Sequence, residues 1–184
     1  MEDLMEKSKM LRSLAASAVF SALLCIASPF SLNIGAIPIS LATFFVYLSA
    51  VVLGMKMGYA SVVTYILLGA LGLPVFASFS AGAGILVGPT GGYIIGYIPC
   101  ALIVGLASDK AKKLRFPALI AAMLIGTAVL YLFGTAWYIF LTGVGVKKAV
   151  LTCVVPFLAG DCVKIAAASL LGTAVREAMR RSVR

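Results

Sequence analysis

The stretch Pro156-Phe-Leu-Ala-Gly-Asp-Cys-Val-Lys-Ile-Ala-Ala-Ala-Ser-Leu-Leu-Gly172 holds an acid and a base, Asp161 and Lys164, inside an otherwise apolar run. The rest of the chain keeps charged side chains outside such runs. An ionised side chain at the centre of a bilayer costs roughly 2.5 to 3.5 kcal/mol, so such residues usually face a partner, a cavity or a ligand. The stretch therefore predicts a membrane helix that carries a candidate functional site.

The composition is typical of an integral membrane protein. Of the 184 residues, 62% are hydrophobic and 11% are charged, and the mean hydropathy is +1.13. These values lie far outside the range of soluble domains. We expect residues 1–184 to form a single transmembrane domain, because the chain is too short to add a soluble catalytic domain.

Charge placement divides the chain into apolar stretches of about 17 to 25 residues, the length that a helix needs to cross a bilayer. The expected fold is therefore an all-α membrane protein with six transmembrane helices. The predicted spans are residues 13–29, 39–55, 57–73, 92–108, 117–141 and 156–175.

The distribution of Lys and Arg predicts the orientation. All 15 of these residues except Lys147, Lys148 and Lys164 fall on the side shared by the two termini. Because such residues accumulate on the cytoplasmic side, both termini should be cytoplasmic, in a multi-pass protein of the cell (plasma) membrane. This topology and the attraction to anionic lipid explain the net charge of +9 without nucleic-acid binding.

Two alternative interpretations of the chain are weaker. The apolar run at residues 14–26 resembles a secretory signal, but five further spans need an uncleaved first helix. A disulfide between Cys153 and Cys162 is less favoured than apolar packing of the cysteines. Because the chain has no His and no Cys-x-x-Cys pattern, we expect neither a metal site nor a cofactor.

The connection between the third and fourth spans, residues 69–93, is rich in Gly and Pro. Irregular backbone at membrane depth is tolerated only where protein or a water-filled cavity satisfies its polar groups. This connection predicts a Gly-rich outer lid or re-entrant loop that carries Phe76, Phe79 and Tyr93 as stacking surfaces. The alternative is that the glycines only allow close helix packing. The shorter connection at residues 31–40 forms either the opposite wall of the site or a plain turn.

Asp161 and Lys164 should lie on one face of their helix, close enough to pair, because they are three residues apart. If the helix begins at Pro156, they lie about 7 to 8 Å and about 12 Å below its start, in the outer half of the bilayer. A structural ion pair is the plain alternative. The Gly-rich loops expected above the pair favour a ligand site.

The sequence disfavours enzymes. No nucleotide-binding P-loop is present, so any ATP hydrolysis must take place in partner subunits. An intramembrane enzyme is also disfavoured, because the chain lacks His and a recognisable nucleophile motif. A self-sufficient proton-coupled carrier for a small vitamin-like solute, with Asp161 as its relay, stays open.

Three motifs resemble those of the BioY biotin-transport proteins, the substrate-binding S components of energy-coupling factor (ECF) transporters. The motifs are Ile37-Pro-Ile-Ser-Leu-Ala-Thr43, Gly72-Leu-Pro-Val-Phe76 through Gly88-Pro-Thr-Gly-Gly-Tyr93, and Pro156-Phe-Leu-Ala-Gly-Asp-Cys-Val-Lys164. The resemblance covers nearly the whole chain. One departure is Ala42, where members of the family often have Gln.

The resemblance implies a six-helix S component that captures biotin with high affinity at its extracellular side, with Asp161 and Lys164 in contact with the ligand. It also implies that Ala18 and Ala22 dock against a transmembrane coupling subunit, which bears two cytoplasmic ATPase subunits. Small residues at these positions suit the close approach of another helix.

The chemistry of biotin agrees with this assignment, because its ureido group offers two N–H donors and a C=O acceptor. We expect Asp161 to accept from a ureido N–H and Lys164 to donate to the ureido C=O. The carboxylate at the far end of the ligand should then reach loop hydroxyls such as Ser78 or Thr90. The full set of expected ligand-binding residues is Asp161, Lys164, Tyr93, Phe76, Ser78, Phe79, Thr90 and Thr43.

Overall fold

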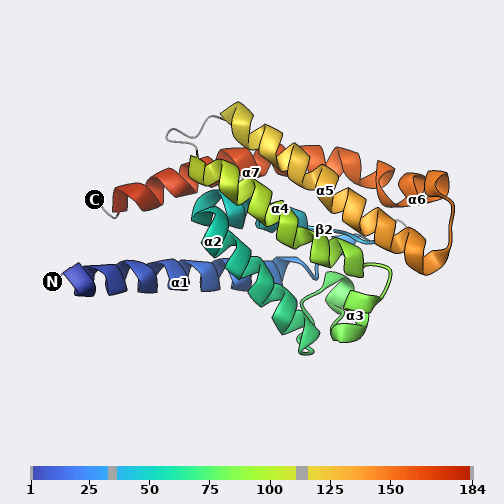
Figure 1. Cartoon of the computed structure of the whole chain (residues 1–184), viewed down its shortest axis with the longest axis horizontal. Helices are drawn as coiled ribbons and strands as arrows, with labels where there is room; N and C mark the ends of the chain where they lie inside the picture. The colour runs from blue at the N-terminus through green and yellow to red at the C-terminus, as the bar shows by residue number, and fades with distance from the viewer. Residues whose placement is uncertain (1, 33–36, 111–115, 183–184) are drawn as a thin grey trace.

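The computed structural model describes residues 2–32, 37–110 and 116–182, which fold into a helical bundle (Figure 1). The elements, in chain order, are α1 (Glu2–Ala27), β1 (Ser31–Leu32), β2 (Ile39–Ser40), α2 (Ala42–Ala70), the 3₁₀ helix η1 (Ala77–Phe79), α3 (Ala83–Val87), α4 (Gly91–Lys110), α5 (Phe116–Thr142), α6 (Val146–Cys153) and α7 (Val155–Ser182). The two short strands pair antiparallel, with Ser31 opposite Ser40.

Among the described residues, five helices are long and apolar enough to cross a membrane: α1, α2, α4, α5 and α7. The prediction of a mostly helical membrane protein is thereby confirmed. The count differs from the six spans expected, because the second and third predicted spans, residues 39–55 and 57–73, together correspond to the single helix α2.

The helix α2 is not straight, because its backbone breaks at Gly54 (φ 78°, ψ −172°). A Cβ atom on Gly58 would lie 2.8 Å from the Cα of Ala50, whereas residues eight apart in a straight helix are separated by about 12 Å. The chain therefore reverses at Gly54 and forms two arms, residues 42–53 and 55–70. Charge placement had predicted this boundary at Lys56, two residues later.

Side chains from α4 and α7 satisfy the backbone groups that this reversal leaves open. The amide of Met55 donates to Asp109 Oδ2 (2.9 Å), and Arg176 Nη1 donates to the carbonyl of Val51 (2.8 Å). Arg176 Nη2 also pairs with Asp109 Oδ1 at 3.3 Å. Because a helix end leaves unpaired N–H and C=O groups, these contacts stabilise both arms of α2. The sequence analysis used Arg176 only as an indicator of orientation and did not consider Asp109.

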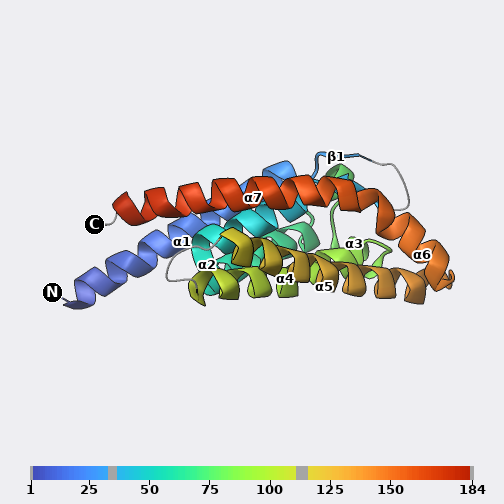
Figure 2. The ribbon, with the colours of Figure 1, turned by 90° about the horizontal axis from the view of Figure 1, so that it is seen from above.

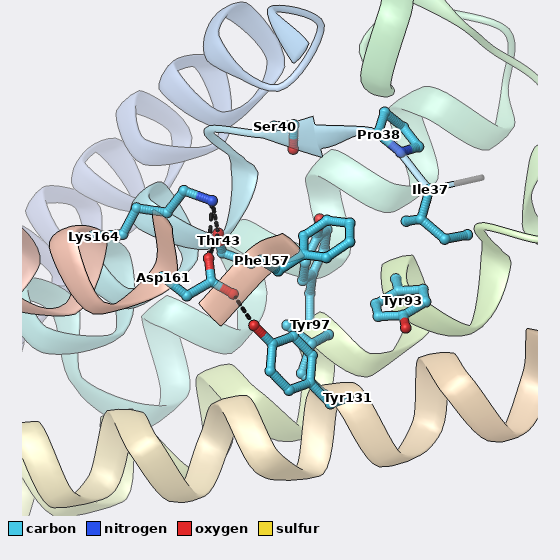
Figure 3. Close-up of a pocket in the computed structure, with 11 residues that line it drawn as sticks. Ile37, Pro38, Ser40, Thr43, Tyr93, Tyr97, Tyr131, Phe157, Asp161 and Lys164 are labelled. Atoms are coloured by element: carbon cyan, nitrogen blue, oxygen red, sulfur yellow. Dashed lines mark hydrogen bonds and ion pairs between the residues drawn. The ribbon is translucent and has the colours of Figure 1, made fainter. Parts of the chain in front are cut away.

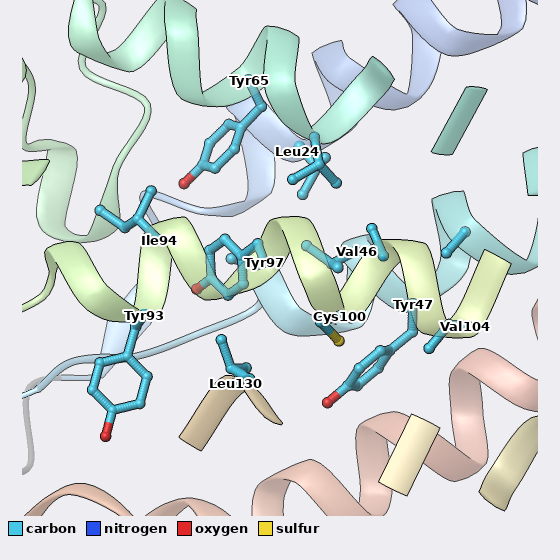
Figure 4. Packing of buried hydrophobic residues seen from close by; sticks show 14 of the residues in the cluster. Leu24, Val46, Tyr47, Tyr65, Tyr93, Ile94, Tyr97, Cys100, Val104 and Leu130 are labelled. Carbon is cyan, nitrogen blue, oxygen red and sulfur yellow. The ribbon is translucent and has the colours of Figure 1, made fainter. Parts of the chain in front are cut away.

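The bundle has two distinct ends. The start of α1 and the end of α7 lie at one end, while α3 and α6 lie at the other (Figures 1 and 2). The expected charges Lys112, Lys113, Arg115 and Arg184, and positions 33–36 of the first connection, lie outside the described residues. Between the two ends, buried side chains of α1, α2, α4, α5 and α7 form most of the apolar core, which includes Leu24, Tyr47, Tyr65, Val104 and Leu130 (Figure 4).

Replacing Gly54 with Ala should destabilise the fold, because a positive φ strains an L residue and the new Cβ would collide with the carboxylate of Asp109. We expect a melting temperature in detergent that is about 6 °C lower or more, corresponding to a cost of about 3 kcal/mol. The matched control is Gly143→Ala, which also has a positive φ (68°) but no atom within 4 Å of the added Cβ. Equal losses in the two variants would contradict a specific role for the contact with Asp109.

Candidate functional site

A cavity lies between the helices, toward the end of the bundle that carries α3 and α6 (Figure 3). It encloses about 340 Å³ of unfilled space, including its mouth. Four helices and the segment that leads into α2 contribute its walls. The lining residues are Asp161, Lys164 and Phe157 of α7, Leu130 and Tyr131 of α5, Tyr93 and Tyr97 of α4, Thr43 of α2, and Ile37, Pro38 and Ser40.

The acid and base predicted from the sequence form the charged part of this cavity. Lys164 Nζ lies 2.9 Å from Asp161 Oδ1 and donates to Thr43 Oγ1 at 3.0 Å. Asp161 is only 3% exposed. Pro156 lies in the first turn of α7, as expected. Because Asp161 and Lys164 are three residues apart on this helix, their side chains lie on one face and meet. The pair faces a cavity and protein rather than lipid.

Tyr131 completes the cluster from α5. Its hydroxyl donates to Asp161 Oδ2 at 2.6 Å, and the hydroxyl of Thr43 approaches Asp161 Oδ1 at 3.4 Å. Oδ1 therefore accepts from both Lys164 and Thr43, whereas Oδ2 accepts from Tyr131 and keeps one lone pair for a ligand. Lys164 uses two of its three N–H donors within the described residues, so the third can serve a ligand acceptor. The cluster offers a polar ligand an acceptor and a donor side by side.

Aromatic rings form the apolar walls beside this cluster. The ring of Tyr93 stacks on Phe157, with centroids 6.5 Å apart and planes 14° apart. The hydroxyl of Tyr93 donates to the carbonyl of Cys153 (3.1 Å) and is also hydrogen-bonded to Thr135 (3.0 Å). Because these contacts fix the ring, it presents a rigid flat surface to a ligand.

The structure brings some of the predicted ligand residues together and separates others. Asp161, Lys164, Thr43 and Tyr93 line the cavity. Phe76 and Thr90 line an adjoining cavity of about 450 Å³, which Tyr93 also borders.

Ser78 and Phe79 line neither cavity, and their contact with the ligand stays a prediction. The amide of Ser78 donates to the carbonyl of Pro29 (3.0 Å), and its hydroxyl lies 3.0 Å from that of Ser31. Phe79 is 60% exposed, and its ring meets Phe30 edge-on at 5.6 Å. Both residues have positive φ, which turns them toward the segment after α1. They join the outer loop to the first connection.

The Gly-rich connection is irregular, as expected, and its glycines serve two purposes. Gly72 (φ 106°) and Gly82 (φ 95°) adopt conformations that other residues rarely reach. Gly69 instead leaves room for the ring of Phe76, which a Cβ would displace. The glycines therefore make turns and also allow close packing.

Sequence reasoning missed Tyr97, Tyr131 and Phe157. A Tyr inside an apolar span is a signal, because a buried hydroxyl needs a partner. The chain has several such residues, and their spacing alone does not tell which ones face the cavity. Ala42 is 1% exposed and does not line the cavity, in keeping with its lack of a polar side chain.

The cysteines carry no cross-link in the structure. All four are free, so the alternative of a Cys153–Cys162 disulfide is not realised. Burial raises the pKa of the Cys153 thiol above its usual value. Within the described residues, no group of three or more His, Cys, Asp or Glu side chains could hold a metal ion.

Comparisons with known proteins converge on one family. A family model described as the BioY family matches residues 2–181. The chain is 40% identical over 167 residues to the biotin transporter BioY of Thermotoga maritima, covering 91% of this chain and 97% of that protein. It is 42% identical over 154 residues to a probable biotin transporter BioY of Pyrococcus horikoshii, covering 84% of this chain and 90% of that protein.

A solved structure has the same fold. The crystal structure of the S-component for biotin from an ECF-type ABC transporter matches with a TM-score of 0.86 and 25% sequence identity. The match covers 92% of this chain and 93% of that chain.

Replacing Tyr131 with Phe should lower the free energy of unfolding by about 1.5 to 3 kcal/mol, because it removes a hydrogen bond to a buried charged carboxylate. Thermal unfolding in detergent would measure the effect. The control is Tyr138→Phe, a partly buried Tyr of the same helix that does not line the cavity. Equal melting temperatures for wild type and Tyr131→Phe would show that this hydrogen bond does not support the site.

Proposed function

Because the chain belongs to the BioY family, we propose that it captures biotin with high affinity at the extracellular face, as the S component of an ECF transporter. Its function is biotin transport, as the names of its relatives and its fold support. The observation that carries the proposal for the site is the cluster of Asp161, Lys164, Thr43 and Tyr131 on the wall of a cavity. The whole chain acts as one transmembrane substrate-binding domain in the cell membrane, with both termini cytoplasmic.

The chemistry of the cluster suits the ureido end of biotin. Asp161 accepts from a ureido N–H, and the third N–H of Lys164 donates to the ureido C=O. The two side chains lie 2.9 Å apart, so one small planar group can reach both, whereas the carboxylate of biotin lies beyond an aliphatic chain. Placing that carboxylate beside Asp161 would instead bring two anions together, which is unfavourable at a buried position.

The exposed face of α1 supports docking to a coupling subunit. Ser17 and Ser21 turn toward α2, where their hydroxyls donate to the carbonyls of Met57 and Ser61, each at 3.1 Å. Ala18 and Ala22 lie exposed on the same helix. Small residues let another helix approach closely, so this face fits the transmembrane coupling subunit. The two ATPase subunits that drive import then belong to the partner complex.

Calorimetry of the purified protein tests both the ligand and its orientation. We expect wild type to bind biotin, and Asp161→Asn and Lys164→Met each to weaken binding by about tenfold or more, because each loses a charge-assisted hydrogen bond worth about 1.5 to 3 kcal/mol. Lys164→Met should weaken binding of biotin and of its carboxyl amide by the same factor.

Unrelated vitamins serve as the ligand control. If wild type binds none of them and does not bind biotin either, the proposed function fails. If Lys164→Met removes only a preference for the free carboxylate, the ligand lies in the opposite orientation.

Replacing Ala18 with Trp should abolish biotin uptake while leaving calorimetric binding of biotin unchanged, because the bulky ring blocks close helix approach far from the cavity. Uptake of labelled biotin would be measured in cells that also produce the coupling and ATPase subunits. Ala136→Trp, at an exposed position of α5, is the matched control and should transport normally. Uptake by vesicles that lack these subunits would instead support a self-sufficient carrier.

A further inference from the structure

The short helix α6 carries two lysines, Lys147 and Lys148, at the end of the bundle toward which the cavity lies (Figures 1 and 2). Both lysines are exposed. Ala149 and Cys153 of the same helix are fully buried, so α6 is packed against the bundle and holds the lysines in place. Because Lys and Arg accumulate on the cytoplasmic side of membrane proteins, two lysines at the opposite end are a departure from the usual pattern.

These lysines give this end of the bundle its net charge. The other two connections at this end, residues 28–41 and 71–90, contain no charged residue, and residues 143–154 contain the two lysines and no acid. Inside the cavity, Asp161 and Lys164 form an ion pair at 2.9 Å and together contribute no net charge. An anion in the solution at this end is therefore attracted by two positive charges that no nearby acid cancels.

The two lysines are close to the wall of the cavity. The carbonyl of Cys153, in the last turn of α6, accepts a hydrogen bond of 3.1 Å from the hydroxyl of Tyr93, and Tyr93 lines the cavity. Lys147 and Lys148 precede Cys153 by six and five residues, which is about 7.5 to 9 Å along the helix axis. The Debye length is about 10 Å at 0.1 M salt, so part of their field reaches the cavity unscreened.

We propose that Lys147 and Lys148 steer an anionic ligand toward the cavity and so raise the rate of its capture. This inference rests on the proposed function. Biotin carries a carboxylate, which is ionised at neutral pH as other carboxyl groups are. Long-range attraction acts before contact, so it speeds association, and it acts on the free acid and not on the uncharged carboxyl amide. Neither lysine lines the cavity, and the role does not require contact with the bound ligand.

Binding kinetics of the full-length protein test this proposal, in nanodiscs of phosphatidylcholine, a lipid without net charge. Rapid filtration with radiolabelled biotin and radiolabelled biotin amide would give the association and dissociation rates at about 10 mM and about 1 M salt. At low salt, replacing both lysines, Lys147→Gln with Lys148→Gln, should slow association of biotin about threefold and leave its dissociation unchanged. At high salt, where the Debye length is about 3 Å, wild type and variant should associate with biotin equally fast. The amide should distinguish neither protein at either salt concentration.

The matched control removes the same charge from the other end of the bundle. Lys56→Gln with Lys110→Gln changes two exposed lysines near the reversal of α2, and this variant should capture biotin at the wild-type rate. Arg at positions 147 and 148 keeps the charge and should also leave the rate unchanged. Wild-type association at high salt shows that the Gln variant at these positions is folded. If it does not bind there, the two single variants replace it, each with an expected slowing of about 1.7-fold at low salt.

Three results would overturn the steering role alone. They are unchanged association of biotin in the Lys147 and Lys148 variants at low salt, equal slowing by the control at Lys56 and Lys110, and equal slowing of biotin and its amide. Equal slowing by the control would indicate an effect of total charge, and equal slowing of the amide would indicate a structural effect. Absence of biotin binding by wild type would instead overturn the proposed function.

Discussion

The arrangement of this bundle depends on compensating the negative charge of Asp161, which is buried away from water. The carboxylate receives Lys164 from its own helix α7, Thr43 from α2 and Tyr131 from α5. A buried charge is tolerated only when it is paired and hydrogen-bonded. These three helices must therefore meet at one depth, and where they meet they leave a polar wall beside an unfilled space. The same contacts that make the buried charge acceptable also prepare a binding site.

A second polar cluster marks the other end of the bundle. Asp109 and Arg176 hold the reversal of α2 at Gly54, and α7 contributes to both clusters through Lys164 and Arg176. These two residues are separated by about 18 Å along the helix axis, at 1.5 Å per residue. Each cluster contains one acid and one base: the buried Asp161 pairs with Lys164, and the exposed Asp109 pairs with the buried Arg176. Apolar side chains fill the space between them.

Sequence reasoning succeeded where a local rule determined the result. The i, i+3 spacing of Asp161 and Lys164 predicted their pairing, and the cost of charge in a membrane predicted that they face a cavity. The role of Tyr131 was not predicted, because no local rule determines which face of a uniformly apolar helix turns inward. The reversal at Gly54 was misplaced, because a one-residue turn has no loop composition to reveal it. Residue type predicted Ser78 and Phe79 as ligand contacts, but it could not show their contacts with Pro29 and Phe30, which the backbone geometry of the loop determines.

The contacts of Ser78 and Phe79 connect two segments of the chain near the outer side of the site. They fasten the Gly-rich loop to the segment that follows α1, through the Ser31 hydroxyl, the Pro29 carbonyl and the Phe30 ring. Because these contacts join the Gly-rich loop to the segment after α1, neither segment can move away without breaking them or displacing the other.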